Sequence, residues 1–215
     1  MKKTSKAKFR RRQEEKTNYK RRLALIKSNQ TRITFRKSNK YIKVQAINYD
    51  PKGDKCIASA TSKELKEIGW KANKNIPSAY LTGYLLGKKA IKQKVKKGIF
   101  DLGLITPVRK SKAFATLQGV IDSGIEIKMG EEAKVPEDRL KGKHIEDYAK
   151  TNEEKFSEYS KNGIDPKTLT NLFDKTKNAI DKKFSSSKVV EWKEEQAKKE
   201  KKWLKRENSQ KKKKH

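Results

Sequence analysis

Cationic, hydroxyl, amide and aromatic side chains alternate along the stretch RITFRKSNKYIKVQ, which spans residues 32–45. Guanidinium groups bind phosphates through paired N–H donors. A tyrosine ring can stack on an unpaired base. The spacing therefore predicts contact with a nucleic acid, although a solvated sheet face with scattered lysines would look similar. The candidate contacts here are Arg32, Arg36, Ser38, Asn39, Lys40, Tyr41, Lys43 and Gln45.

Two further basic segments belong to the same hypothesis. Residues 1–22 contain 11 basic and two acidic residues without apolar periodicity. Burying an unpaired charge is costly, so this arm needs an external counter-charge and is expected to order on its partner. The other segment is the loop TPVRKSKAF. The candidates in the two segments are Arg10, Arg11, Arg12, Lys16, Tyr19, Arg21, Arg22, Arg109, Lys110 and Lys112.

Catalytic alternatives have weaker support in the sequence. GYLLGKK lacks the spacing and the Ser/Thr of a phosphate-binding loop. One cysteine and two histidines cannot form a zinc ligand set. A nucleophile–base pair would have to use His144, for which a structural hydrogen bond near a helix start is the simpler reading. A metal-dependent nuclease would need Asp50, Asp101 and Asp122 to converge, but these residues carry no recognisable metal motif, and cap and turn roles are the simpler explanation. No catalytic residue, cofactor or metal is therefore predicted.

Composition supports a polyanion partner. The 215 residues carry 57 Lys+Arg against 26 Asp+Glu, a formal net charge of +31. Only 33% are hydrophobic, enough for one modest core. No apolar run reaches the roughly 18–20 residues of a membrane-spanning helix, and no apolar signal-peptide stretch follows the basic N-terminus. The single cysteine excludes an intrachain disulfide and fits a reducing compartment. We expect neither a membrane nor a small-molecule substrate as partner.

The strands and helices that must position these residues can be inferred from sequence patterns. Together they predict an α/β fold with a mixed sheet. Period-two alternation predicts three antiparallel strands, in TRITFRKSN, YIKVQAINY and CIASAT. A fourth strand is expected over 99–106. A short helix is expected after Thr61, and longer helices are expected over 75–95 and 112–127. A further helix is expected over 165–180, where Asp165 and Pro166 mark the start. Gly83 and Gly87 lie on one helix face and would admit a close neighbour.

Composition shifts divide the chain into four parts. We expect a basic RNA-binding arm over 1–26, an α/β core over 27–127 and a helical extension over 128–184. The stretch 131–160 is net negative, with nine acids and six bases. A basic tail, helical or disordered, occupies 185–215.

Several motifs occur in an order that resembles a known family. They are FRRRQEEKTNYKRRLALIKS, RKSNKYIKVQ, NIPSAYLTGYLLGKKA, DLGLIT, AFATLQGVIDSGIEI and GKHIEDYA. Together they resemble the universal large-subunit ribosomal protein family number eighteen in its archaeal form, whose eukaryotic counterpart is large-subunit protein five. The likeness covers about residues 8–148 strongly and extends more weakly to residue 180.

The resemblance implies a structural constituent of the large ribosomal subunit in the cytoplasm. It implies binding of 5S rRNA in the central protuberance, with large-subunit rRNA and neighbouring ribosomal proteins as further partners. It also implies a ribonuclease H-like outline used for RNA binding without catalysis. The motif NIPSAYLTGY carries the family's helix signature, and no family role is transferred to the tail. A general RNA- or DNA-packaging protein remains the alternative from composition alone, with a nuclease behind it.

Overall fold

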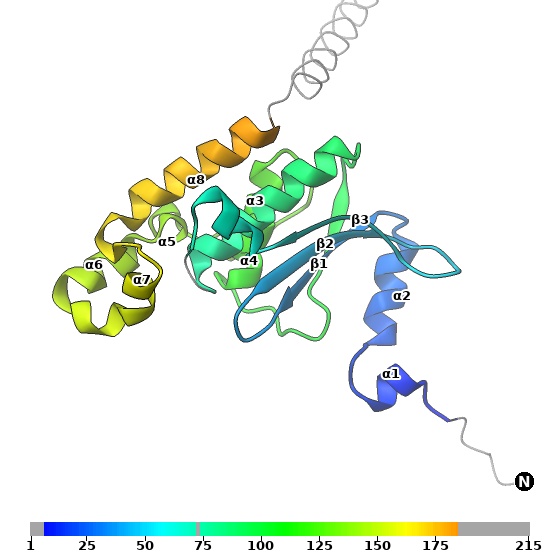
Figure 1. Cartoon of the computed structure of the whole chain (residues 1–215). Coiled ribbons are helices and arrows are strands. Elements are labelled where there is room, and N and C mark those ends of the chain that lie inside the picture. The colour runs from blue at the N-terminus through cyan, green and yellow to red at the C-terminus, as the bar shows by residue number, and fades with distance from the viewer. Residues whose placement is uncertain (1–6, 72–73, 185–215) are drawn as a thin grey trace, which may run out of the picture.

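The core of the molecule is a four-stranded sheet with two helices on one face (Figure 1). The computed structural model describes residues 7–71 and 74–184. Strands β1 (Thr31–Lys37), β2 (Ile42–Asn48) and β3 (Lys55–Thr61) form the predicted antiparallel meander. Strand β4 (Gly98–Asp101) pairs parallel to β1, which makes the order β3-β2-β1-β4 and the sheet mixed. The predicted α/β class is confirmed.

The fourth strand ends earlier than the predicted 99–106. Gly103 adopts a φ of +62°, and its N–H donates to the Asp101 carboxylate at 2.8 Å. This turn closes the strand at Asp101, because a left-handed residue cannot continue an extended ladder. The three residues that follow, Leu104 to Thr106, therefore leave the sheet and enter the loop before the next helix.

Helices α3 (Ile76–Lys92) and α4 (Lys112–Asp122) cover one face of the sheet. Asn75 caps α3 by accepting from the Ser78 N–H at 2.8 Å. The two helices touch through their backbones. A Cβ on Gly83 would lie 2.1 Å from the Thr116 carbonyl oxygen. The predicted close approach at Gly83 is confirmed, and it explains why both helices can pack on so small a sheet.

The hydrophobic core lies between these helices and the sheet. Ile33 and Phe35 of β1 are fully buried, as are Ile42 and Val44 of β2, as the alternation predicted. Burial of such side chains supplies the main favourable free energy of folding. The 3-10 helix η1 (Glu64–Ile68) closes one end of this layer, and the Glu64 carboxylate accepts from the Thr61 N–H at 3.0 Å.

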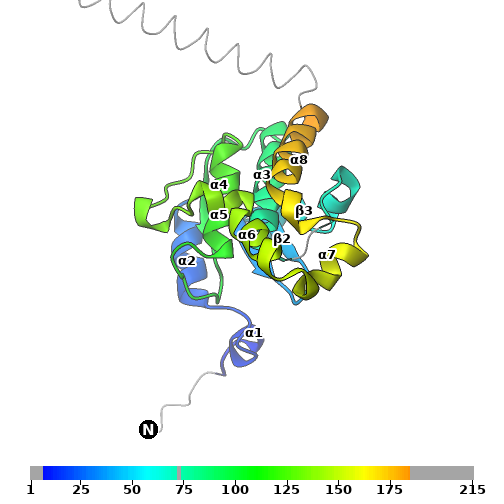
Figure 2. The same ribbon diagram turned by 90° about the vertical axis from the view of Figure 1, so that its left-hand side faces the viewer.

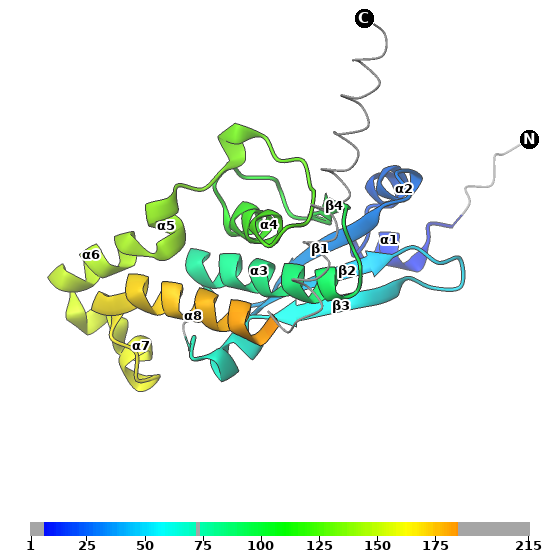
Figure 3. The same cartoon turned by 90° about the horizontal axis from the view of Figure 1, so that it is seen from above.

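The chain after residue 127 forms a helical extension. Its elements are η2 (Glu131–Ala133), α5 (Glu137–Lys141), α6 (Lys143–Thr151), η3 (Glu153–Phe156), α7 (Ser157–Lys161), η4 (Pro166–Thr168) and α8 (Leu169–Phe184). Helix α8 runs beside α3 (Figure 3) and buries Leu169, Phe173 and Ile180, which confirms the predicted apolar face. Phe173 contacts the Trp70 ring edge-on at 6.2 Å.

The arm has more regular structure than expected. Helices α1 (Arg10–Gln13) and α2 (Tyr19–Lys27) form where no periodicity was found. The Asn18 side chain caps α2 by accepting from the Arg21 N–H at 3.1 Å. That the arm orders on its partner stays a prediction. Figures 1 and 2 show α2 beside one end of the sheet and α1 projecting away from the body.

Candidate nucleic-acid interface

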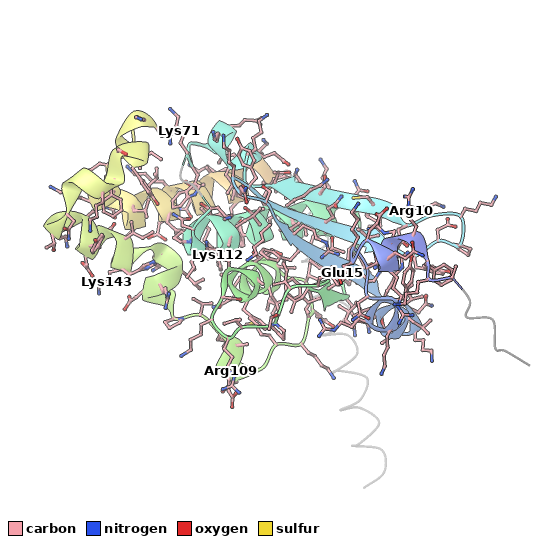
Figure 4. All side chains as sticks on the ribbon, turned by 90° about the horizontal axis from the view of Figure 1, so that it is seen from below. Arg10, Glu15, Lys71, Arg109, Lys112 and Lys143 are labelled. Atoms are coloured by element: carbon pink, nitrogen blue, oxygen red, sulfur yellow. The ribbon has the colours of Figure 1, made fainter. Side chains whose placement is uncertain are left out.

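The face of the sheet opposite α3 and α4 carries the polar residues of the meander. Arg36 of β1 lies opposite Lys43 of β2 in the strand register. In the next row of the same face, Gln45 pairs with Thr34 on one side and Ser59 on the other. This face is turned toward the viewer in Figure 4 and carries no helix across its centre in the described part of the chain. We call the side chains of Arg36, Lys43 and Gln45 with the turn 38–41 the sheet-face cluster.

Arg36 is the arginine of this cluster, and it is accessible to a ligand. Its side chain is 51% exposed, and one Nη donates to the Phe35 carbonyl at 2.7 Å. The other Nη lies 3.8 Å from a carboxylate oxygen of Asp101, a weak contact at this separation. Contacts with the end of β4 therefore orient the guanidinium. Its remaining N–H donors can bind a phosphate.

Arg32 does not belong to this exposed surface. It is only 4% exposed and lies 2.5 Å from a carboxylate oxygen of Asp54. A second carboxylate, that of Asp101, lies 3.6 Å away. The expectation of Arg32 on a solvated face is wrong, because α2 and the turn between β2 and β3 cover that end of the sheet. Its Nε is buried without a hydrogen-bond partner.

Asn39 and Lys40 form the exposed tip of the turn between β1 and β2. Ser38 is engaged within the turn: its hydroxyl donates to the Tyr41 carbonyl at 3.0 Å and accepts from the Tyr41 N–H at 2.9 Å. Tyr41 is half-buried, with the Lys66 ammonium 6.0 Å from the ring centre. The turn therefore holds Tyr41 in place through Ser38, and its exposed tip offers the amide and ammonium of Asn39 and Lys40.

Three lysines gather at the end of the molecule where α3 and α4 begin. Lys74 donates to the Ser38 carbonyl at 2.8 Å, which places it over the end of β1 beside Lys37. Lys112 opens α4 and is half-buried. Burial, followed by the charges of Lys74 and Lys37, lowers the pKa of Lys112 below its usual value. The free protein thus holds like charges together, an arrangement that an anion would relieve.

The predicted loop residues do not all join this lysine group. Arg109 is exposed and pairs with Glu132 at 2.6 Å. Lys110 has a φ of +55° and is also exposed. Figure 4 shows Arg109 on the outer part of the loop and Lys112 nearer the middle of the molecule. The structure therefore separates the three loop candidates.

The arm residues fall into two groups. Arg10, Arg11 and Arg12 of α1 are exposed, and Lys16 forms an exposed ion pair with Glu14. The arm residues nearer the sheet contact other residues of the protein. Tyr19 packs its ring 5.1 Å from that of Phe9, Arg21 donates to the Gly103 carbonyl at 3.3 Å, and Arg22 pairs with Asp54 at 2.9 Å. Figure 4 shows Arg10 far from Lys112, so the predicted residues form an extended surface and not one patch.

The three candidate carboxylates of a nuclease each have another role. Asp50 accepts from the Lys55 ammonium at 2.6 Å and from the Lys52 N–H. These bonds hold the pKa of Asp50 below its usual value. Asp101 caps the turn after β4, and Asp122 accepts from the Tyr80 hydroxyl at 2.7 Å. Among residues 7–71 and 74–184, no three His, Cys, Asp or Glu side chains are grouped to hold a metal ion.

The remaining candidates from the sequence are also accounted for. His144 lies at the second position of α6, and its pKa is lowered mainly by burial and secondarily by Arg139. GYLLGKK is part of α3 and contains the Gly83 contact with α4, not a loop. Within the described ranges, no helix is long and apolar enough to cross a membrane.

Sequence reasoning missed Asp54, Lys37 and Lys74. Asp54 lies in the segment DPKGDK, and there a turn residue and an ion-pair anchor have the same local signature. Lys37 and Lys74 are 37 residues apart in sequence. Only the tertiary fold brings the β1 end and the α3 start together, so no local signal could have identified the pair.

Comparison with known proteins agrees with this geometry. A family model described as "Ribosomal large subunit proteins 60S L5, and 50S L18" matches residues 3–100. The protein named large ribosomal subunit protein uL18 of Metallosphaera sedula is 45% identical over 184 residues, covering 81% of this chain and 94% of the relative. The proteins of the same name from Korarchaeum cryptofilum and Sulfurisphaera tokodaii are 44% and 43% identical, and cover 79% and 80% of this chain and 90% and 93% of their own lengths.

Proposed function

The chain belongs to the L5e/L18 family of large-subunit ribosomal proteins, and from this premise we propose that it binds 5S rRNA and helps attach it to the large-subunit rRNA. The location would be the central protuberance. The finer partners rest on the family resemblance; the ribosomal class rests on the match over 94% of a relative. No catalytic step is part of this proposal.

The observation that carries the proposal is the sheet-face cluster with the arm beside it. Exposed cations supply phosphate contacts, which position a protein on RNA, and an aromatic ring with nearby amides supplies base contacts, which specify. Arg36 and Lys43 lie opposite each other in register, and Tyr41 is in the turn just beyond them. A surface with both kinds of group fits a folded RNA with unpaired bases better than a uniform duplex.

A division of labour follows from the fold. We assign 1–26 to an RNA-binding arm, 27–127 to the RNA-binding core and 128–184 to a helical extension that contacts neighbouring large-subunit proteins or rRNA. The net-negative stretch 131–160 supports a protein partner at this end. The antiparallel meander followed by a parallel β4 supports the ribonuclease H-like outline. The proposed tail, 185–215, lies outside the described residues.

A competition experiment tests the proposal. Labelled 5S rRNA, with unlabelled 5S rRNA or tRNA as competitor, is incubated with the full chain in Mg²⁺ at a stated salt concentration. We expect an intact complex that 5S rRNA displaces at much lower concentration than tRNA. Equal competition by both RNAs would indicate a general packaging protein, and cleaved RNA would indicate a nuclease; either result contradicts the proposal.

A further inference from the structure

Asp54 joins two arginines that come from different elements. Its carboxylate accepts from an Nη of Arg22 at 3.0 and 2.9 Å and lies 2.5 Å from an Nη of Arg32. Arg22 belongs to α2, whereas Arg32 belongs to β1. The side chain of Arg32 is only 5% exposed. One carboxylate in the turn between β2 and β3 thus ties the arm helix to a buried position of the sheet.

The connection extends across the sheet. The other Nη of Arg32 lies 3.6 Å from Asp101 at the end of β4, and Asp101 in turn lies 3.8 Å from Arg36. Charges of alternating sign therefore run from the arm to Arg36, the arginine of the sheet-face cluster. Because Arg32 is desolvated, its partners are held in a narrow range of positions, and removing one leaves a buried charge without full compensation.

Apolar packing does little to hold α2 in place. None of its nine residues is buried, Leu23 is 56% exposed, and the half-buried Leu25 and Ile26 are not among the residues that pack against the hydrophobic core. Arg21 makes a further polar contact between α2 and the body, donating to the Gly103 carbonyl at 3.3 Å. The position of the helix consequently depends on polar contacts, among which the pair from Arg22 to Asp54 has the best geometry.

A carboxylate beside a basic arm is unfavourable for attracting RNA, since it subtracts from the positive field. We propose that Asp54 is a positioning residue that holds α2, and the arm with it, against the sheet before RNA arrives. An arm placed in advance pays less ordering entropy on binding, which raises affinity without adding a phosphate contact. This inference rests on the proposed RNA-binding function for its affinity readout.

The test compares Asp54→Asn with Asp50→Asn. Both variants remove one negative charge from the same connection between β2 and β3, but Asp50 contacts Lys55 and not the arm. We expect Asp54→Asn to weaken 5S rRNA binding about tenfold, equivalent to ~1.4 kcal/mol, with the salt slope unchanged. Asp50→Asn should bind as tightly as the natural chain or slightly tighter. Asp54→Asn that binds equally well or better would overturn the proposal.

A cycle with Arg22 shows whether Asp54 acts through the arm. In an Arg22→Gln background, Asp54→Asn should cost less than about twofold, because the contact of Asp54 with the arm is already gone and its remaining contact, with Arg32, does not involve the arm. An undiminished tenfold loss in that background would mean that Asp54 acts elsewhere, which contradicts the proposal. Asp54→Glu, which retains the charge, should recover part of the affinity.

An RNA-free readout separates this inference from the proposed function. Amide hydrogen exchange of residues 19–27 should accelerate in Asp54→Asn and in Arg22→Gln, but not in Asp50→Asn, while the exchange of α3 stays slow. If Asp54→Asn fails to fold, the Arg22→Gln comparison decides the same question. If amide exchange of α2 is unchanged in a folded Asp54→Asn variant, Asp54 does not position the helix and the proposal is wrong. Equal competition by tRNA with accelerated exchange would sink only the proposed function.

Discussion

Arg36 and Tyr41 are close in sequence but offer RNA different chemistry. The guanidinium of Arg36 is half exposed and retains free donors, whereas the ring of Tyr41 is half-buried and held by the turn. Arg32, which the alternation placed beside Arg36, is instead committed to two carboxylates. At this scale the structure separates cations available to a ligand from cations used inside the protein.

The two accessible residues should respond differently to alanine. Arg36→Ala should reduce the salt-dependence slope of 5S rRNA binding by about 0.7–0.9, the contribution of one phosphate contact. Tyr41→Ala should leave that slope unchanged and cost about 1–3 kcal/mol if the ring stacks on a base. Binding measured at four salt concentrations checks both. Lys175→Ala, exposed on α8, is the control and should change neither; identical behaviour of the two variants would refute separate roles.

Lys112 should show a conflict between stability and binding. The pKa of Lys112 is lowered in the folded protein, so the fold disfavours the charged form of the side chain. At pH values below this folded pKa, the charged side chain therefore reduces the stability of the protein. The penalty disappears as pH rises past the unfolded value of 10.5. Lys112→Met should therefore stabilise the free protein at pH 7, by less than about 1 kcal/mol given its partial exposure, and should weaken RNA binding.

Thermal unfolding at pH 7 and at strongly alkaline pH measures the first effect, and the RNA titration measures the second. Lys175→Met serves as the control because Lys175 lies exposed on α8. A Lys112→Met variant that is destabilised at pH 7, or that binds RNA with full affinity, would show that the lysine group is not the strained cationic site described above.

At the scale of elements, backbone contact between α3 and α4 decides the shape of the core. Asn75 and Pro77 start α3 as the sequence indicated, and its glycines face α4. The two tyrosines of the same helix reach different partners: Tyr80 donates to Asp122 at the end of α4, whereas Tyr84 points toward α8. Tyr84 donates to Asp181 of α8 at 2.7 Å, and burial is the first cause that raises the pKa of Tyr84. The motif NIPSAYLTGY thus joins α4 and α8 to one helix.

Gly83→Ala should destabilise the protein by at least about 1–3 kcal/mol, the usual cost of overpacking. The added Cβ would lie 2.1 Å from the backbone oxygen of Thr116, so α3 and α4 would have to separate. The matched control is Gly130→Ala, where a Cβ meets nothing within 4 Å. Denaturant unfolding checks both variants. Equal stability of the two would mean that the helices do not touch as described.

At the scale of the whole molecule, the helical extension is part of the folded unit. Phe173 of α8 is 3% exposed, and its ring lies 5.4 Å from the Tyr80 ring of α3 and 6.2 Å from the Trp70 ring. A neighbouring ion pair connects Lys88 of α3 with Asp181 of α8 at 2.6 Å. These contacts couple residues that are about a hundred positions apart.

Phe173→Ala should therefore lower the free energy of unfolding by about 3–5 kcal/mol, as for other buried aromatic truncations. The core and the extension should still unfold in one transition, at a lower midpoint temperature. Calorimetry and the fluorescence of the buried Trp70 both follow this unfolding. The two melting curves should coincide, because a two-state transition looks the same to every probe. Asn178→Ala, exposed on the same helix, is the control and should have little effect. A separate early transition for the extension, with the core unchanged, would contradict a single folded unit.

The sequence by itself determined the meander, helices α3 and α8 and the buried faces of β1 and β2, because period-two and period-3.6 patterns are local consequences of burial. It also determined the family and the basic character of the candidate interface. Tertiary structure alone decided that Arg32 is buried and that Asp54 ties it to Arg22. An alternating strand pattern states which side a residue is on, but whether that side meets solvent depends on what the rest of the chain places over it.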